Sequence, residues 1–181
     1  IYVGYNRLFY RSINYIKKLN LKNTNINIEC IEKNKNSFLE NSCHVVSILL
    51  YIFGEVEIKS KIQRKDYIIV NFQDEKSNDI IFKVLFGVEK NFRIEINNRK
   101  FQYQLKPLEK LYTFKKISRF KKNNENFYIE NKKNLINEYN NNQLKPGFFL
   151  MWKKFRNFLK SERSQVDVQF AYKVIEVSNQ I

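Results

Sequence analysis

The chain contains a single histidine, His44, which lies in the most apolar stretch of the sequence, ENSCHVVSILLYIFG. Residues three or four apart share one face of a helix, so a polar stripe is predicted on this segment. Its members are Glu40, His44, Ser47 and Tyr51. A carboxylate one turn from an imidazole can orient the ring and raise its pKa, which suits a general acid or base. The other interpretation is a core histidine bonded to Glu40 or to a backbone carbonyl, and the pattern alone slightly favours it.

Other catalytic chemistries find little support in the residue types. Cys43 adjoins His44, but adjacent helix positions point about 100° apart, so the two do not form a nucleophilic dyad. One histidine and two separated cysteines, Cys30 and Cys43, provide no zinc site, and no HExxH or CxxC occurs. The same two cysteines indicate no disulfide framework and fit a reducing cytoplasm. The four glycines form no G-x-G-x-x-G, so this chain alone is not expected to bind a dinucleotide.

The sequence is strongly basic, with 33 Lys and Arg against 18 Asp and Glu and a net charge of +15. Such a charge can indicate a phosphate-rich partner. The lysines are scattered, however, and heavy use of Lys, Asn and Ile is typical of an AT-rich genome, so nucleic acid is not expected as a partner. The densest basic stretch, TFKKISRFKKNNENF at 113–127, is predicted to be an exposed strand end and loop. The longest apolar run, 45–53, is shorter than the roughly 20 residues of a spanning helix, so no membrane partner is expected either.

Local patterns predict the elements that would position His44. Near-alternate aromatic and β-branched residues in IYVGYNRLFY predict a strand over residues 1–7. A helix should follow, with Ser12 as its N-cap. INIECIE at 26–32 alternates as a second strand, and the helix that carries His44 should end in a C-cap at Gly54.

Beyond Gly54 the pattern changes to short runs of period 2 that are separated by turn residues. The runs are EVEIKSKIQ, DYIIVNFQDEK, DIIFKVLFGVE, NFRIEIN and KFQYQL. Their short connections predict an antiparallel meander. Three helices should follow over 125–142, 145–161 and 166–181. The second of these is predicted to face the core with Phe148, Met151, Trp152, Phe155, Phe158 and Leu159. The predicted class is α+β, an open, mostly antiparallel β-sheet with helices packed on one face.

Five strings in this chain resemble one enzyme family. VGYNRLFYRSINYIKKL is similar to the segment that opens the C-terminal domain of the Gfo/Idh/MocA oxidoreductases, which often carry YNRRF-P there. ENSCHVVSILLYIFGEVE resembles the family's second signature, an acidic residue followed after three residues by His and an apolar helix. LKPLEKL, KPGFFLMWKKF and AYKVIEVSNQI resemble further stretches of members that act on nucleotide-linked sugars. The likeness follows the family's order over nearly the whole chain.

This resemblance implies that residues 1–181 are one substrate-binding and oligomerisation domain, and that the N-terminal Rossmann domain is absent from this chain. In the family that first domain binds NAD or NADP, while the second holds the sugar and often joins another subunit through the open sheet face. A lysine of the first domain, the helix histidine and its upstream carboxylate move the proton during hydride transfer. The chain would then be an excised domain, a truncated gene product or one partner of a split enzyme.

The resemblance also suggests site residues. His44 matches the catalytic histidine, and Glu40 matches the acidic position one turn before it. Arg7 matches the first arginine of YNRRF, and its guanidinium could hold a carboxylate or phosphate of the substrate. Further substrate-binding candidates are Tyr5, Asn6 and Asn41.

The leading expectation is therefore the substrate-binding half of a cytoplasmic NAD(P)-dependent oxidoreductase acting on a sugar or nucleotide sugar, forming a homo-oligomer and inactive alone. One alternative is a basic, non-catalytic nucleic-acid-binding module, in which Lys and aromatic side chains alternate on the sheet. Another is a degenerate pseudoenzyme that keeps only the dimerisation sheet. Ser47, which stands where the family commonly has Asp, favours this last alternative.

Overall fold

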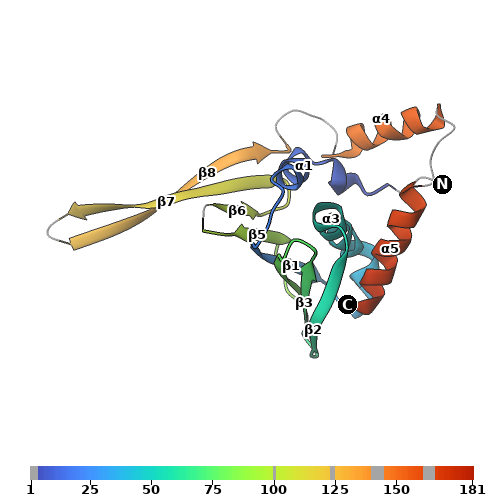
Figure 1. Cartoon of the computed structure of the whole chain (residues 1–181), viewed down its shortest axis with the longest axis horizontal. Helices are drawn as coiled ribbons and strands as arrows, with labels where there is room; N and C mark the ends of the chain where they lie inside the picture. The colour runs from blue at the N-terminus through green and yellow to red at the C-terminus, as the bar shows by residue number, and fades with distance from the viewer. Residues whose placement is uncertain (1–3, 100, 123–124, 140–144, 161–165) are drawn as a thin grey trace.

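The computed structural model describes residues 4–99, 101–122, 125–139, 145–160 and 166–181. A single eight-stranded sheet has the order β2-β3-β4-β1-β5-β6-β7-β8 (Figure 1). The strands are β1 Asn25–Glu32, β2 Val56–Gln63, β3 Tyr67–Asp74, β4 Asp79–Phe86, β5 Arg93–Asn97, β6 Gln102–Leu105, β7 Lys110–Lys122 and β8 Glu125–Asn137. The helices are η1 Asn6–Phe9, α1 Arg11–Lys18, η2 Lys35–Ser37, α2 Phe38–Asn41, α3 Cys43–Phe53, α4 Phe148–Leu159 and α5 Val166–Gln180.

The sheet is antiparallel except at one pair of strands. β1 lies between β4 and β5, parallel to β4 and antiparallel to β5. Every other neighbouring pair is antiparallel. The five strands predicted after Gly54 are thus confirmed, but β1 inserts into the middle of the expected meander. Helices α2 and α3 supply the crossover that such an insertion requires.

Alternate residues of the central strands point into a core on one side of the sheet. The strands contribute Ile26, Ile28, Cys30, Val70, Phe72, Phe82, Val84, Ile94 and Ile96, all buried. Helices α1, α3 and α5 cover this side, and α3 lies between the sheet and α5 (Figure 1). The period-2 and helix-face patterns therefore give the predicted α+β class, an open and mostly antiparallel sheet with helices on one face.

Helix α3 is buried on nearly all sides because α5 packs against its outer surface. Val45, Val46, Ile48 and Leu49 are fully buried in it. The helix ends as predicted at Gly54, whose φ of 78° is favourable only for glycine and whose N–H donates to the carbonyl of Leu50. This burial fixes the position of the helix, so the residues of its first turn are held firmly.

The prediction of an opening strand is wrong for residues 4–7, and residues 1–3 lie outside the described chain. Residues 6–9 form the 3-10 helix η1 instead. The aromatic side chains of this opening segment contact helices rather than a neighbouring strand. Tyr5, for example, packs edge-on against Phe170 of α5, with ring centroids 6.0 Å apart.

The prediction of a polar helix over 125–142 is also wrong. Residues 125–137 form β8, which pairs with β7 to make a long hairpin that projects from the body (Figure 1). Residues 140–142 lie outside the described chain. Most of this hairpin is exposed, so polar and apolar residues are mixed on both faces of β8. No strand periodicity is therefore visible in its sequence. Pairing with β7 decides the conformation.

The helix predicted over 145–161 is confirmed as α4, but its predicted core face is not. None of its residues is buried. Residue 161 lies outside the described chain. The third predicted helix is confirmed as α5, in which Val174 and Val177 are buried and Phe170 is partly buried.

Candidate functional site

A buried carboxylate at the end of β1 forms hydrogen bonds with the residues just before α3. Glu32, the last residue of β1, is 2% exposed. Its carboxylate accepts a hydrogen bond from the Ser42 hydroxyl and another, at 3.3 Å, from the Asn41 amide. A carboxylate at a helix N-terminus also interacts favourably with the helix dipole. Asn41 therefore holds this helix in place, and the sequence analysis missed Glu32. The alternation of β1 places Glu32 on the buried face beside Ile28 and Cys30, which was the available signal.

His44 lies in the first turn of α3, half buried, with its ring edge-on to Tyr5 at 5.8 Å between centroids. Its Nδ1 atom is buried and has no hydrogen-bond partner among the described residues. Burial lowers the pKa of the imidazole, and the positive charges of Arg7 and Lys145 lower that pKa further. His44 is therefore a neutral imidazole at neutral pH.

The predicted effect of Glu40 on His44 is wrong. Glu40 is exposed and belongs to α2, and the chain turns at Ser42 before α3 begins. The two side chains therefore do not share one continuous helix, and the pKa of His44 is lowered rather than raised. The other members of the predicted stripe have local partners. The Ser47 hydroxyl donates to the His44 carbonyl at 2.7 Å, and the Tyr51 hydroxyl donates to Asn14 at 2.8 Å.

Arg7 lies in η1, and its guanidinium covers the ring of Phe92 at 4.9 Å from the ring centroid. Its Nη1 atom is buried and has no hydrogen-bond partner among the described residues. Tyr5 and Arg7 thus both lie near His44. Burial raises the pKa of Cys43, which disfavours its thiolate form.

The segment before α4 packs directly on η1. The Asn6 amide donates to the carbonyl of Pro146 at 3.3 Å. Gly147 has φ 80°, and a Cβ built on it would come within 2.1 Å of the Asn6 carbonyl oxygen. This close approach places Lys145 next to the site. Sequence reasoning missed Lys145, because nothing local shows that residues 145–147 contact residue 6.

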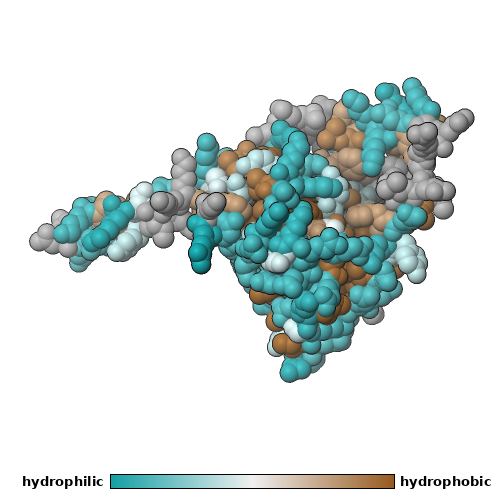
Figure 2. Space-filling view, viewed as in Figure 1, coloured by the Kyte–Doolittle hydropathy of each residue, from teal (hydrophilic) through white to brown (hydrophobic). Residues whose placement is uncertain are grey.

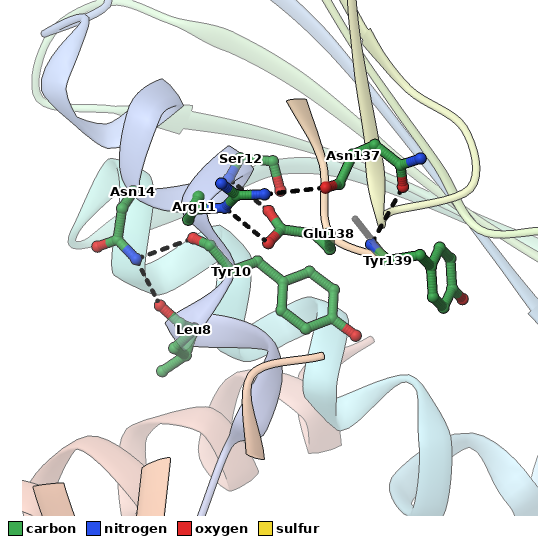
Figure 3. A network of polar contacts seen from close by, with 8 residues as sticks. All are labelled: Leu8, Tyr10, Arg11, Ser12, Asn14, Asn137, Glu138 and Tyr139. Carbon is green, nitrogen blue, oxygen red and sulfur yellow. Dashed lines mark hydrogen bonds and ion pairs between the residues drawn. The ribbon is translucent and has the colours of Figure 1, made fainter. Parts of the chain in front are cut away.

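A polar network holds α1 and η1 on the end of β8 (Figure 3). The Arg11 guanidinium donates to the Asn137 carbonyl at 2.9 Å and forms an ion pair with Glu138 at 3.6 Å. The backbone N–H of Ser12 donates to the same carboxylate at 2.8 Å. Ser12 is therefore not the predicted N-cap, because α1 already begins at Arg11. The network fixes the segment that carries Tyr5 and Arg7.

Other features of the described residues lie apart from this site or are missing. An open groove of about 660 Å³ lies between the end of α1 and the β5–β6 turn, and its lining shares no residue with the site. Within the described ranges, no cluster of His, Cys, Asp and Glu could hold a metal ion. No helix in that part of the chain is long and apolar enough to cross a membrane.

Comparison with known proteins identifies the fold. No family model and no curated protein matches the sequence. Among solved structures, a dehydrogenase (MviM) from Clostridium difficile matches 99% of this chain and 60% of its own, with a TM-score of 0.76 and 17% identity. A UDP-N-acetylglucosamine 3-dehydrogenase from Acidithiobacillus ferrooxidans matches 98% and 59%, with a TM-score of 0.65 and 12% identity. A 3-ketoreductase from Actinomadura kijaniata, solved with TDP-benzene and NADP, matches 98% and 59%, with a TM-score of 0.67 and 6% identity.

These identities are low, so the likeness concerns the fold. The match extends over almost all of this chain, and the chain spans about 60% of each of the three relatives. The chain therefore has the fold found in part of the Gfo/Idh/MocA-type dehydrogenases.

Proposed function

We propose that residues 1–181 are the substrate-binding half of an NAD(P)-dependent oxidoreductase that acts on a sugar or nucleotide sugar. It would work only beside a dinucleotide-binding domain. One observation carries this proposal: two buried polar atoms, Nη1 of Arg7 and Nδ1 of His44, lie in the same site without partners. Unsatisfied buried polar groups are costly, so their persistence favours a ligand that completes them. The names of the similar proteins support a sugar nucleotide as that ligand.

In this proposal His44 acts as the base. A neutral imidazole can accept the proton of a sugar hydroxyl while the C–H bond at the same carbon breaks and the hydride leaves, which yields a ketone. The nicotinamide of NAD or NADP, held by the other domain, supplies the hydride acceptor. Arg7 holds an anionic group of the substrate, and Tyr5 and Asn6 contribute to substrate binding beside it. The roles of Glu40 and Asn41 would be secondary, because Glu40 points to solvent and Asn41 bonds Glu32.

The test uses the complete reading frame that contains these residues, assayed by nicotinamide absorbance with UDP-N-acetylglucosamine and related sugars. His44→Ala should reduce turnover by about 10²–10⁴-fold, the usual contribution of general acid–base catalysis. Glu40→Gln is the matched control and should cost far less. Unchanged turnover in His44→Ala, with the fold intact by circular dichroism, would remove His44 from the mechanism. No turnover in the wild type would support the pseudoenzyme instead.

We also propose that the open sheet face joins a second copy in a reducing cytoplasm. Apolar side chains on this face support a contact. Ile31 lies opposite Leu85, and Ile81 is 36% exposed between Asn27 and Asn71. Light scattering would test this proposal, since Ile81→Lys should give monomers where the wild type is dimeric. An unchanged mass would contradict it.

The nucleic-acid alternative has one feature in its favour, the β7–β8 hairpin. Near its tip Phe120 stacks on Phe127 at 5.3 Å between ring centroids, and Tyr128 is 66% exposed beside Arg119. Exposed aromatic rings among cations are typical of single-strand binding. Fluorescence anisotropy with a labelled oligonucleotide decides the matter. A module of this kind would bind at low salt and lose affinity steeply as salt is added. No binding at low salt would eliminate it.

A further inference from the structure

Helix α4 carries the largest anomaly among the described elements. Eight of the twelve residues in FFLMWKKFRNFL are apolar, four Phe, two Leu, Met and Trp, yet none of the twelve is buried. Phe149, Trp152 and Leu159 are 56%, 58% and 65% exposed. Figure 2 shows apolar residues at the surface around α4, next to its basic ones. Several large apolar side chains exposed together in this way mark a contact with another body.

The underside of α4 shows where that body must sit. Met151 packs against Gly4 so closely that a Cβ on Gly4 would come within 2.9 Å of its sulfur. Lys154 places its ammonium 5.7 Å from the ring centroid of Phe9. The inner side of α4 thus contacts residues 4–9, the segment that carries Tyr5 and Arg7 to His44. Helix α4 therefore lies next to the segment that carries Tyr5 and Arg7, with its exposed side turned away from that segment.

We propose that the exposed apolar face of α4 is the docking surface for the dinucleotide-binding domain, an inference that rests on the proposed function. A hydride passes only between atoms in close contact, so the nicotinamide must approach the substrate held at His44. A domain that brings it there must contact the surface around η1, and α4 is the apolar part of that surface. The similar dehydrogenases support such a partner, because about 40% of each lies beyond the part that this chain matches. This chain contains no G-x-G-x-x-G of its own.

The experiment measures hydrogen exchange of α4 by mass spectrometry in two proteins. One is the chain of residues 1–181, which has its own continuous core. The other is the complete reading frame that contains it. Amides of Phe148–Leu159 should exchange at least about tenfold more slowly in the complete protein, because docking covers them. Helix α1 is the internal control and should not change, since Ile13 and Ile16 are already buried in the chain alone.

Substitutions identify the face. Trp152→Glu should abolish the added protection of α4 and reduce hydride transfer. Tyr128→Glu places the same charge on an equally exposed aromatic residue of the β7–β8 hairpin and should change neither. Three results would overturn the inference. The first is equal exchange of α4 in both proteins, and the second is protection of α4 that survives Trp152→Glu. The third is protection of α4 in residues 1–181 alone that rises with protein concentration, because it would show a homodimer contact instead.

These results are separable from a failure of the proposed function. If α4 is protected in the complete protein and Trp152→Glu removes that protection, the docking surface stands even where no sugar is oxidised. If His44 proves catalytic while α4 exchanges equally in both proteins, the oxidoreductase stands and the docking surface does not.

Discussion

Replacing Gly147 by alanine tests how closely the loop before α4 packs on the segment that carries Arg7. At φ 80° an added side chain costs about 1–2 kcal/mol in backbone strain. The new Cβ would also lie 2.1 Å from the backbone oxygen of Asn6, where real contacts are no closer than 3.0 Å, so one backbone must move by about 0.9 Å. Overpacking of this kind adds about 1–3 kcal/mol. The expected loss in unfolding free energy is therefore about 2–5 kcal/mol.

Gly87→Ala is the matched control for this experiment. Its φ of 70° causes similar strain, but nothing lies within 4 Å of the added Cβ. Urea unfolding of both variants should place Gly147→Ala at least about 1 kcal/mol below Gly87→Ala. In the complete protein, a displacement of Asn6 and Arg7 of this size should also cut turnover by up to about 10²-fold. Equal stabilities for the two variants would refute the close packing of residues 145–147 on η1.

Three further predictions concern α3 and the charge of His44. Leu49→Ala, at a fully buried position, should lower the unfolding free energy by about 2–5 kcal/mol; Leu39→Ala, 50% exposed, should cost far less, and similar urea midpoints would contradict the burial of α3. The folded-state pKa of His44 lies below its ordinary value of 6.5, so the unfolded chain binds the proton more tightly. Stability should therefore fall as the pH drops from about 6.5 through the folded pKa, and His44→Gln should remove that part of the loss. Arg7→Gln should raise the pKa of His44 in an NMR titration, and an unchanged midpoint would show that the guanidinium does not act on the ring.

Most of the sheet and the buried helices could be predicted from local pattern. The strands after Gly54 alternate because one face is buried. Helix α3 is largely apolar because both the sheet and α5 cover it. Such patterns fail where burial is slight. β8 lies in an exposed hairpin and has no continuous apolar face, so its strand could not be predicted from periodicity. Helix α4 has an apolar face that this chain does not bury, so its predicted place in the core was wrong.

The candidate site was predictable in part. The resemblance brought Tyr5, Arg7 and His44 together, and the structure places them in contact or within electrostatic reach. The effect of Glu40 was mistaken because the turn at Ser42 cannot be seen as a break in a helical pattern. Lys145 was missed because it reaches the site through a contact with a segment far away in the sequence.

The charges around His44 bear on how such a site would work. Arg7 and Lys145 both lower the pKa of the imidazole, and among the described residues no carboxylate opposes them. A base of lowered pKa is a poor proton acceptor, so the unliganded chain is not poised for oxidation. Under the proposed function, an anionic substrate on Arg7 would neutralise part of this charge and raise the pKa of His44 towards neutrality. A neutral sugar would bring no such change. The same substrate charge would then both bind Arg7 and activate the base. Arg7→Gln, which raises the pKa of His44 by itself, should therefore weaken substrate binding more than it slows the chemical step.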